Sequence, residues 1–198
     1  MICALLLAGG RGERFGGDKL AATLADGTPV ALAASRPLLA GCDRVLAVLR
    51  PGREALGERL QAEGCELLVS PCTRQGMGAS LAAGVAATPE AGAWLVALAD
   101  MPLVAPATVA ELAARLRAGA GIVMPEYDGR RGHPVGFAAR FGPALRALAG
   151  DTGARRVVRA HPGCVVTVPV ADPGILRDVD TPADLAAMNE GGDTRDDG

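Results

Sequence analysis

Short apolar runs alternate with segments of helical periodicity along almost the whole chain. This alternation is typical of a mostly parallel sheet that helices cover on both faces, so it predicts a single-domain α/β fold. The chain has 198 residues, 49% of them apolar, which is enough for one core of that kind. Strands are expected at residues 2–8, 44–49, 66–69, 94–99, 122–124 and 165–168. Helices are expected at residues 29–39, 53–62, 79–86, 107–118, 143–148 and from residue 181 onward.

The expected domain covers residues 1–189, and the polar, acidic stretch at residues 190–198 is expected to be a disordered tail. No apolar run approaches the roughly 18 to 20 residues that cross a bilayer. The N-terminus also lacks a basic leader with a cleavage site, so we expect a cytoplasmic protein without a membrane partner. The net charge of −2 and the scattered basic residues argue against a nucleic-acid partner.

The first expected strand runs into a glycine-rich segment between residues 9 and 19. In a parallel sheet, ligands bind beyond the carboxyl ends of the strands, which is where this segment lies. Its five glycines allow backbone N–H groups to approach an anion closely, and Arg14 and Lys19 add positive charge. Lys19 is the single lysine beside nineteen arginines, which indicates that a compact ammonium group is required there. The segment therefore predicts a phosphate-binding loop.

Two other interpretations of these glycines compete with this one. A Walker A motif fails, because Asp18 precedes the lysine and no Ser or Thr follows it to reach magnesium. A dinucleotide-binding oxidoreductase stays open, since Gly10, Gly12 and Gly16 approximate the Rossmann fingerprint. Arg50, near the end of the second expected strand, could then read a 2′-phosphate. Against this interpretation, a helix should open at the glycines, whereas some twelve more residues precede helical periodicity.

Two aspartates follow at further loops of the expected sheet. Asp100 ends an entirely apolar strand, where a carboxylate is costly without a partner, and a divalent metal suits that role in an enzyme that handles phosphates. Asp180 lies in the string DVDTP. Each aspartate could instead form a turn or cap a helix. The sequence favours Asp100 as a metal ligand and leaves Asp180 between a metal ligand and a cap.

Two shorter strings lie in other loops. GMGAS places Gly76, Gly78 and Ser80 at a helix start, where a sugar or base can lie against the backbone. GHP contains His133, one of two histidines, in a loop that begins with two arginines. An ordinary surface turn explains GHP equally well, so neither string identifies a site by itself.

Taken in order, LAGGRGERFGGDK, GMGAS, DMP, GHP, GDTGAR and DVDTP resemble the molybdenum cofactor cytidylyltransferases and guanylyltransferases, which share a Rossmann-like, glycosyltransferase-A-like nucleotidyltransferase fold. The resemblance extends from residue 2 to about residue 188. It implies three catalytic residues, namely Lys19, Arg14 and Asp100. It implies a nucleotide site of Leu7, Ala8, Gly9, Gly10, Gly12, Arg14, Lys19, Gly76, Gly78 and Ser80. It further implies Asp100 and Asp180 on the metal side, and His133, Asp151 and Arg155 facing the acceptor.

The resemblance implies that a nucleoside monophosphate is transferred, with Mg²⁺, from CTP or GTP to a molybdopterin-type acceptor. GHP and GDTGAR are similar to the cytidylyltransferase branch, whereas LAGG, in place of LAAG, is similar to the guanylyltransferase branch. We expect CMP transfer and keep GMP transfer as the alternative. Further hypotheses are a sugar-phosphate or isoprenoid-precursor nucleotidyltransferase, the NADP-binding oxidoreductase above, a non-catalytic delivery protein, and a paralogue that serves one apo molybdenum hydroxylase.

The expected reaction is an in-line attack of the acceptor's phosphate oxygen on the α-phosphorus, with release of pyrophosphate. A phosphate monoester has a second pKa of about 6, so the acceptor arrives ionised at neutral pH and needs no general base. The chain agrees with this, because its two histidines do not belong to any arrangement typical of an activated nucleophile. The protein has to supply charge neutralisation and alignment.

Overall fold

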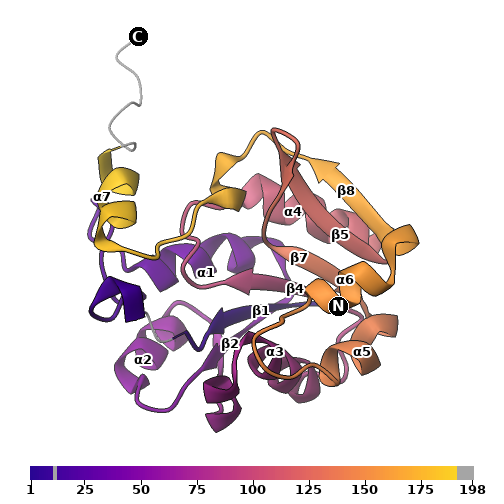
Figure 1. Cartoon of the computed structure of the whole chain (residues 1–198), viewed down its shortest axis with the longest axis horizontal. Coiled ribbons are helices and arrows are strands. Elements are labelled where there is room, and N and C mark those ends of the chain that lie inside the picture. Colours follow the sequence, from indigo (N-terminus) through magenta and orange to yellow (C-terminus); the bar gives the residue numbers. More distant parts are fainter. Residues whose placement is uncertain (11–12, 191–198) are drawn as a thin grey trace.

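The computed structural model describes residues 1–10 and 13–190. Their strands form one eight-stranded sheet in the order β3-β2-β1-β4-β7-β5-β6, with β8 beside β5 (Figure 1). The strands are β1 (Ile2–Ala8), β2 (Arg44–Leu49), β3 (Glu66–Val69), β4 (Ala93–Leu98), β5 (Ile122–Tyr127), β6 (Arg130–Arg131), β7 (Val135–Ala138) and β8 (Val165–Pro169). The first three have the bounds that the sequence predicts.

The sheet is mostly parallel, as predicted. β1 pairs in parallel with β2 and β4, and β2 pairs in parallel with β3. The sequence prediction was wrong in omitting β6 and β7, of which β7 runs antiparallel between β4 and β5. β7 is only four residues long, and one of them is Gly136. A Cβ atom at this position would crowd Val123 and Leu116, so the packing requires glycine there. This glycine interrupts the apolar pattern by which a strand is predicted.

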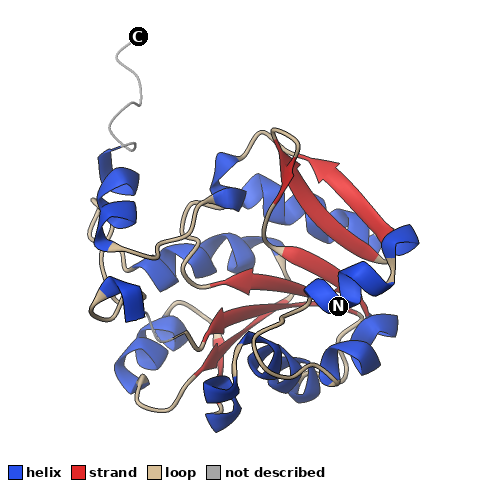
Figure 2. Ribbon diagram, viewed as in Figure 1, coloured by secondary structure: helices blue, strands red, loops and turns tan. Residues whose placement is uncertain are grey.

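Helices cover both faces of the sheet, which confirms the predicted fold class (Figure 2). The helices are α1 (Val30–Gly41), α2 (Glu54–Ala62), α3 (Met77–Ala87), α4 (Pro106–Arg117), α5 (Gly142–Arg146), α6 (Arg155–Ala160) and α7 (Pro182–Glu190). Side chains of α1, α2 and α4 pack in one apolar cluster, and those of α3, α5 and α6 pack in another. The helix α6 has no counterpart in the sequence prediction.

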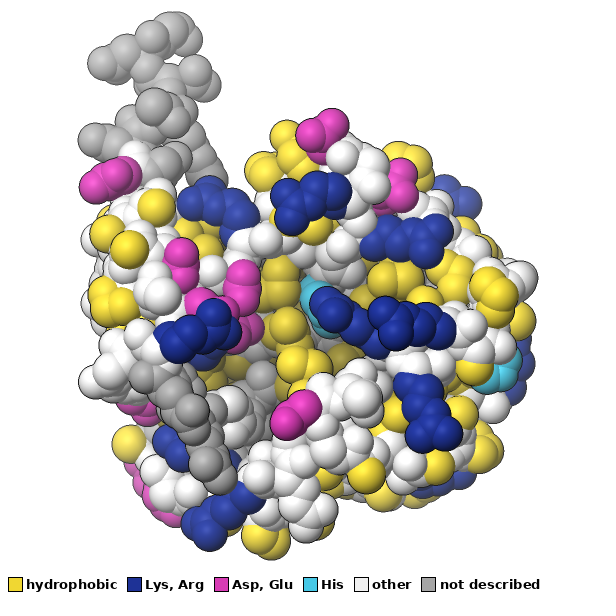
Figure 3. Space-filling view, viewed as in Figure 1, with side chains coloured by type: hydrophobic (Ala, Val, Ile, Leu, Met, Phe, Trp, Pro, Cys, Tyr) yellow, Lys and Arg dark blue, Asp and Glu magenta, His cyan; other side chains and the backbone are white. Residues whose placement is uncertain are grey.

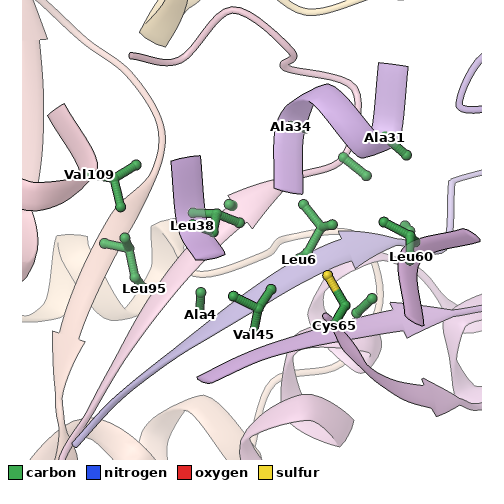
Figure 4. Packing of buried hydrophobic residues seen from close by; sticks show 14 of the residues in the cluster. Ala4, Leu6, Ala31, Ala34, Leu38, Val45, Leu60, Cys65, Leu95 and Val109 are labelled. Carbon is green, nitrogen blue, oxygen red and sulfur yellow. The ribbon is translucent and has the colours of Figure 1, made fainter. Parts of the chain in front are cut away.

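The continuous apolar run of β1 reflects its burial from both sides. Ala4 and Leu6 face the cluster of α1, α2 and α4, which Figure 4 shows, whereas Cys3 and Leu5 face the other cluster. All four residues have zero exposed area. Two helical layers therefore fix the central strand, and the loop that follows its carboxyl end starts from a rigid position.

Two predicted details at helix ends need correction. α1 begins at Val30, and its N-cap Pro29 has extended backbone and forms a β-bridge with Thr23. Pro29, the first residue of the predicted helix, therefore lies outside α1, where this bridge holds it. At the other end, Glu190 still belongs to α7, one residue beyond the predicted domain boundary, and residues 191–198 of the predicted tail lie outside the described residues. Among the helices described, none is long and apolar enough to cross a membrane.

Candidate nucleotide and metal site

Four of the charged residues that the sequence singled out, Arg14, Lys19, Asp100 and Asp180, lie together at the carboxyl edge of the sheet. Nζ of Lys19 lies 2.6 Å from Oδ2 of Asp100 and 3.0 Å from Oδ1 of Asp180. Nη2 of Arg14 lies 2.8 Å from Oδ2 of Asp180. The side chain of Lys19 is only 9% exposed, so carboxylates rather than water balance its charge. Segments 81 and 161 residues apart in the chain meet at this one ammonium group.

The segment that carries Asp180 is held against the end of β4 by its backbone. The N–H of Val179 donates to the carbonyl of Asp100 at 2.8 Å, and the Val179 side chain is fully buried. Beyond it, the Thr181 hydroxyl accepts from the N–H of Asp184, while Oδ2 of Asp184 accepts from the N–H of Thr181. This reciprocal pair caps α7. Asp180 is therefore not the helix cap, and its carboxylate points to Lys19 and Arg14 instead.

Asp178 joins Asp100 and Asp180 in a cluster of three carboxylates. One oxygen of each lies within 4.8 Å of the others. Carboxylate oxygens are the ligands that Mg²⁺ and Mn²⁺ prefer, so this donor set fits a divalent ion of that type. The predicted metal ligands did not include Asp178. The alternation in DVD could have identified it, because residues i and i+2 of an extended segment point to the same side.

The charges of the cluster act on one another. Burial alone lowers the pKa of Lys19, but the hydrogen bonds and charges of Asp100 and Asp180 outweigh it and raise this pKa above its ordinary value. Lys19 is therefore a cation at neutral pH. Partial burial raises the pKa of Asp178, and the negative charges of Asp180 and Asp100 raise it further. A divalent cation would relieve this repulsion between carboxylates.

A cleft of about 490 Å³ adjoins the cluster through Asp100. This volume lies within the range of small-molecule sites. The cleft is lined by Leu7, Gly9, Gly10, Thr73, Arg74, Gly76, Met77, Ser80, Leu98, Asp100 and Asp151. Of the predicted nucleotide-binding residues, Ala8 is buried in the core instead of lining the cleft, and Gly12 lies outside the described residues. Thr73 and Arg74 were not predicted as binding residues, although their turn follows the expected strand at residues 66–69 and so lies at the same edge of the sheet as the first loop.

Gly9 allows the backbone to approach the wall of the cleft. A Cβ atom at Gly9 would lie 2.9 Å from Cβ of Thr73 and 3.2 Å from Oγ of Ser80. A Cβ atom at Gly10 would meet nothing within 4 Å. The first glycine is therefore required by packing, whereas the second borders open space in which a ligand can lie.

Gly76 and Gly78 are required by a contact with the GDTGAR segment. The N–H of Gly78 donates to the carbonyl of Gly150 at 2.7 Å, and a Cβ atom at Gly76 would lie 2.6 Å from the carbonyl carbon of Gly150. Gly76 also has a φ of +114°, which favours glycine. Gly76 and Ser80 line the cleft, whereas Gly78 lies beneath the Gly150 backbone. The contact places Asp151 at the rim of the cleft.

The predicted acceptor-side residues have different surroundings. Asp151 is exposed and lines the cleft, and Arg155 is exposed at the first position of α6. His133 contributes Nδ1 as a buried atom without a hydrogen-bond partner among the described residues, beside an apolar cavity of about 10 Å³. On the face shown in Figure 3, acidic side chains gather on one side of a central hollow, and a histidine and several basic side chains lie on the other.

The electrostatics of His133 predict a pH-dependent stability. Burial lowers the pKa of His133 below its ordinary value, the Val96 backbone and Asp100 oppose this, and Arg155 adds to it. Below a pH of about 6.5 the unfolded chain then binds more protons at this side chain than the folded one, so folding stability is lost as pH falls. We expect the free energy of unfolding of His133→Gln to change less with pH than that of the wild type. Urea unfolding between pH 5 and 8 measures this dependence. An unchanged slope would contradict the assignment.

Arg53 is a further residue of the site that sequence reasoning missed. It is the N-cap residue of α2, and its side chain is only 2% exposed. Nη1 donates to Oδ1 of Asp18 at 2.6 Å, and Nη2 donates to the carbonyl of Gly10 at 3.3 Å. In the sequence, Arg53 looks like an ordinary first residue of a helix.

A mostly parallel α/β sheet with a glycine-rich loop, a buried lysine and clustered carboxylates at its carboxyl edge defines a nucleotide-handling transferase. The chain belongs to the family of MobA-like NTP transferase domains, whose family model matches residues 4–165. The predicted family is thereby confirmed. Asp178 and Asp180 lie just beyond the matched range.

Individual relatives match most of the chain. The chain is 34% identical over 188 residues to "Nicotine blue oxidoreductase" of Paenarthrobacter nicotinovorans, with 91% of this chain and 92% of the relative covered. It is 28% identical over 191 residues to "Purine catabolism protein PucB" of Bacillus subtilis, with the same coverage. Among solved structures, Rv0371c of Mycobacterium tuberculosis has a TM-score of 0.81 at 28% identity and covers 96% of this chain and 97% of its own. That protein has also been solved as a complex with manganese, with a TM-score of 0.77 and 27% identity over 96% of this chain and 98% of its own.

Proposed function

We propose that the protein transfers a nucleoside monophosphate, with CMP favoured over GMP, from a nucleoside triphosphate to the phosphate of molybdenum cofactor, and releases pyrophosphate. The observation that carries this proposal is the buried Lys19 between Asp100 and Asp180, because Asp100 also lines a cleft with Gly9 and Gly10. Membership in the MobA-like NTP transferase family supports the triphosphate as substrate. The order of GHP and GDTGAR after the nucleotide loop favours the pterin acceptor and CTP.

The triphosphate would lie in the cleft, with its phosphates against the backbone after β1. Gly10 offers open space at this point, and Lys19 and Arg14 supply positive charge beside Asp100 and Asp180. Because both cations already pair with carboxylates, they are oriented before a ligand arrives. Their task is to stabilise the charge that develops on the leaving pyrophosphate.

Asp100 and Asp180, with Asp178, would hold the divalent ion. Mg²⁺ bound there supplies charge neutralisation on the phosphates when the reaction takes place. The manganese complex of Rv0371c supports a divalent ion in this fold, and the three clustered carboxylates support it in this chain. His133, Asp151 and Arg155 would then face the acceptor, and its phosphate, already ionised, requires no base from the protein.

Gly9 provides a prediction about the nucleotide site. We expect Gly9→Ala to weaken nucleoside triphosphate binding about 10-fold or more, because its methyl group would meet Thr73 and Ser80 and displace the loop by several tenths of an ångström. Gly163→Ala is the matched control, since a methyl group there meets no atom within 4 Å and Gly163 does not line the cleft. Isothermal titration with CTP and GTP measures both. Equal dissociation constants for wild type and Gly9→Ala would contradict the packing argument.

The proposed function is tested by pyrophosphate release with CTP, GTP, ATP and UTP in parallel, each with Mg²⁺ or Mn²⁺ and with or without molybdenum cofactor. Release that depends on CTP and the cofactor is the expected result. Release with GTP instead of CTP would indicate that the LAGG string determines which base is selected. Release that depends instead on a sugar phosphate or an isoprenoid-precursor phosphate would move the chain to those transferases, and pterin binding without release would indicate a delivery protein. That an apo molybdenum hydroxylase receives the product stays a prediction.

A second candidate function is an oxidoreductase, favoured by the name of the relative at 34% identity. In the sequence, the Rossmann-like spacing of Gly10, Gly12 and Gly16 is the feature that favours an oxidoreductase. In the described residues, however, the glycine loop continues into a single 3-10 turn, Glu13–Phe15, and α1 opens only at Val30. A dinucleotide site of the Rossmann type needs a helix N-terminus at that point. NADPH binding without a metal requirement, and no pyrophosphate release, would favour this candidate.

A further inference from the structure

The buried side chain of Arg53 joins α2 to the glycine-rich loop. Its guanidinium group bonds the Asp18 carboxylate at 2.6 Å and the Gly10 carbonyl at 3.3 Å, across 35 and 43 residues of sequence. The Arg53 side chain therefore binds the glycine-rich loop near both of its ends, at Gly10 and at Asp18. A guanidinium group can do this because its donors form a planar fork that reaches two acceptors at once.

The same contacts act on the residue next to Asp18. Oδ1 of Asp18 also accepts from the N–H of Leu20 at 3.2 Å, and Leu20 is 2% exposed in the apolar cluster of α1. Lys19 lies between these two fixed neighbours. With its backbone held on both sides, the Lys19 side chain extends to Asp100 and Asp180.

Stability alone does not call for a buried arginine here. Taking the Arg53 guanidinium group out of water costs free energy that its attraction to the half-exposed Asp18 carboxylate repays only in part, and an apolar side chain of similar volume often stabilises a fold as well. What an apolar side chain cannot do is bond a backbone carbonyl and a carboxylate in one fixed geometry. We infer that Arg53 is a positioning residue, which holds the loop at Gly10 and Asp18 and thereby orients Lys19 for an anionic ligand; the identity of that ligand as a triphosphate rests on the proposed function.

The test compares Arg53→Met, Arg53→Lys and the surface control Arg36→Met, whose arginine pairs with Glu63 and is 52% exposed. The first readout is amide hydrogen exchange of residues 13–20 without ligand. The second is the dissociation constant for magnesium-CTP and magnesium-GTP, and the third is kcat and KM. The double variant Arg53→Met/Asp18→Asn removes both charges of the pair, so it replaces the single variant where that one does not fold.

We expect the amides of residues 13–20 to exchange about 10-fold faster or more in Arg53→Met, because a local opening no longer breaks the two contacts. We expect the nucleotide dissociation constant and KM to rise about 10- to 100-fold, with a smaller fall in kcat. Arg53→Lys reaches Asp18 but not Gly10 at the same time, so its values should lie between. Arg36→Met should match wild type.

Unchanged exchange and unchanged nucleotide affinity in folded Arg53 variants would overturn the inference. The inference and the proposed function fail separately. Wild-type protein that binds no nucleoside triphosphate would remove the proposed function, whereas the exchange of residues 13–20 would still decide whether Arg53 holds the loop.

Discussion

Lys19→Met is expected to lower the rate of nucleotidyl transfer about 100- to 1,000-fold, the cost typical of losing one oriented charge-stabilising donor. Lys19 is the only lysine, its side chain is 9% exposed, and it pairs with both Asp100 and Asp180. Asp100→Asn should lose activity to a similar degree, because it removes a carboxylate from the predicted metal ligands. The measurement is pyrophosphate release at saturating magnesium and nucleotide.

Lys19→Arg is the informative companion to these variants. It keeps the charge but replaces the compact ammonium group with a planar guanidinium group, so activity should stay low if geometry matters. Circular dichroism and thermal melting show whether each variant is folded. Near-normal transfer in a folded Asp100 variant would remove Asp100 from the metal site, and near-normal transfer in Lys19→Met would remove the lysine from catalysis.

Gly76→Ala is expected to destabilise the fold by about 2 to 5 kcal/mol, the sum of backbone strain and overpacking. Gly76 has a φ of +114°, and its Cβ atom would lie 2.6 Å from backbone atoms of Gly150, which cannot rotate away as a side chain can. The Gly150 loop would have to move from α3, and Asp151 would leave the rim of the cleft with it.

Gly119→Ala separates the two contributions. Gly119 has a φ of +93°, but a methyl group there meets nothing within 4 Å, so only backbone strain of about 1 to 3 kcal/mol is expected. Urea unfolding measures both variants. The inter-loop contact would be unimportant if Gly76→Ala cost no more than Gly119→Ala and left nucleotide affinity unchanged.

The parts of this structure that local patterns determine could be predicted from the sequence. The bounds of β1, β2 and β3 follow from apolar runs between polar loops, and the α/β class follows from their alternation with helices. The prediction missed β7, because Gly136 and the proline that precedes the strand weaken its apolar pattern. The prediction missed α6, because two adjacent β-branched valines in RRVVRA favour a strand over a helix.

The candidate site could be predicted in part for the same reason. Ligand-binding residues of parallel sheets lie in the loops after the strands, and those loops carry Arg14, Lys19, Asp100 and Asp180. The sequence therefore indicates these residues but not which of them pair with one another. The roles of Arg53, Thr73 and Gly78 depend on contacts with segments remote in sequence. Such contacts leave no periodic signal, and Gly78 was assigned to the nucleoside although its N–H bonds Gly150.

The remote origin of the carboxylates around Lys19 has a consequence for biosynthesis. The N-terminal segment with Lys19 is made first, Asp100 follows it, and Asp180 comes 80 residues after Asp100. At the usual elongation rates of about 5 to 20 residues per second, roughly 4 to 16 s separate the two aspartates. During that interval a nascent chain has the lysine and half of its counter-charge. Lys19 can pair with both aspartates only after Asp180, just before α7, has been synthesised. A chain whose synthesis stops earlier therefore cannot carry a complete site.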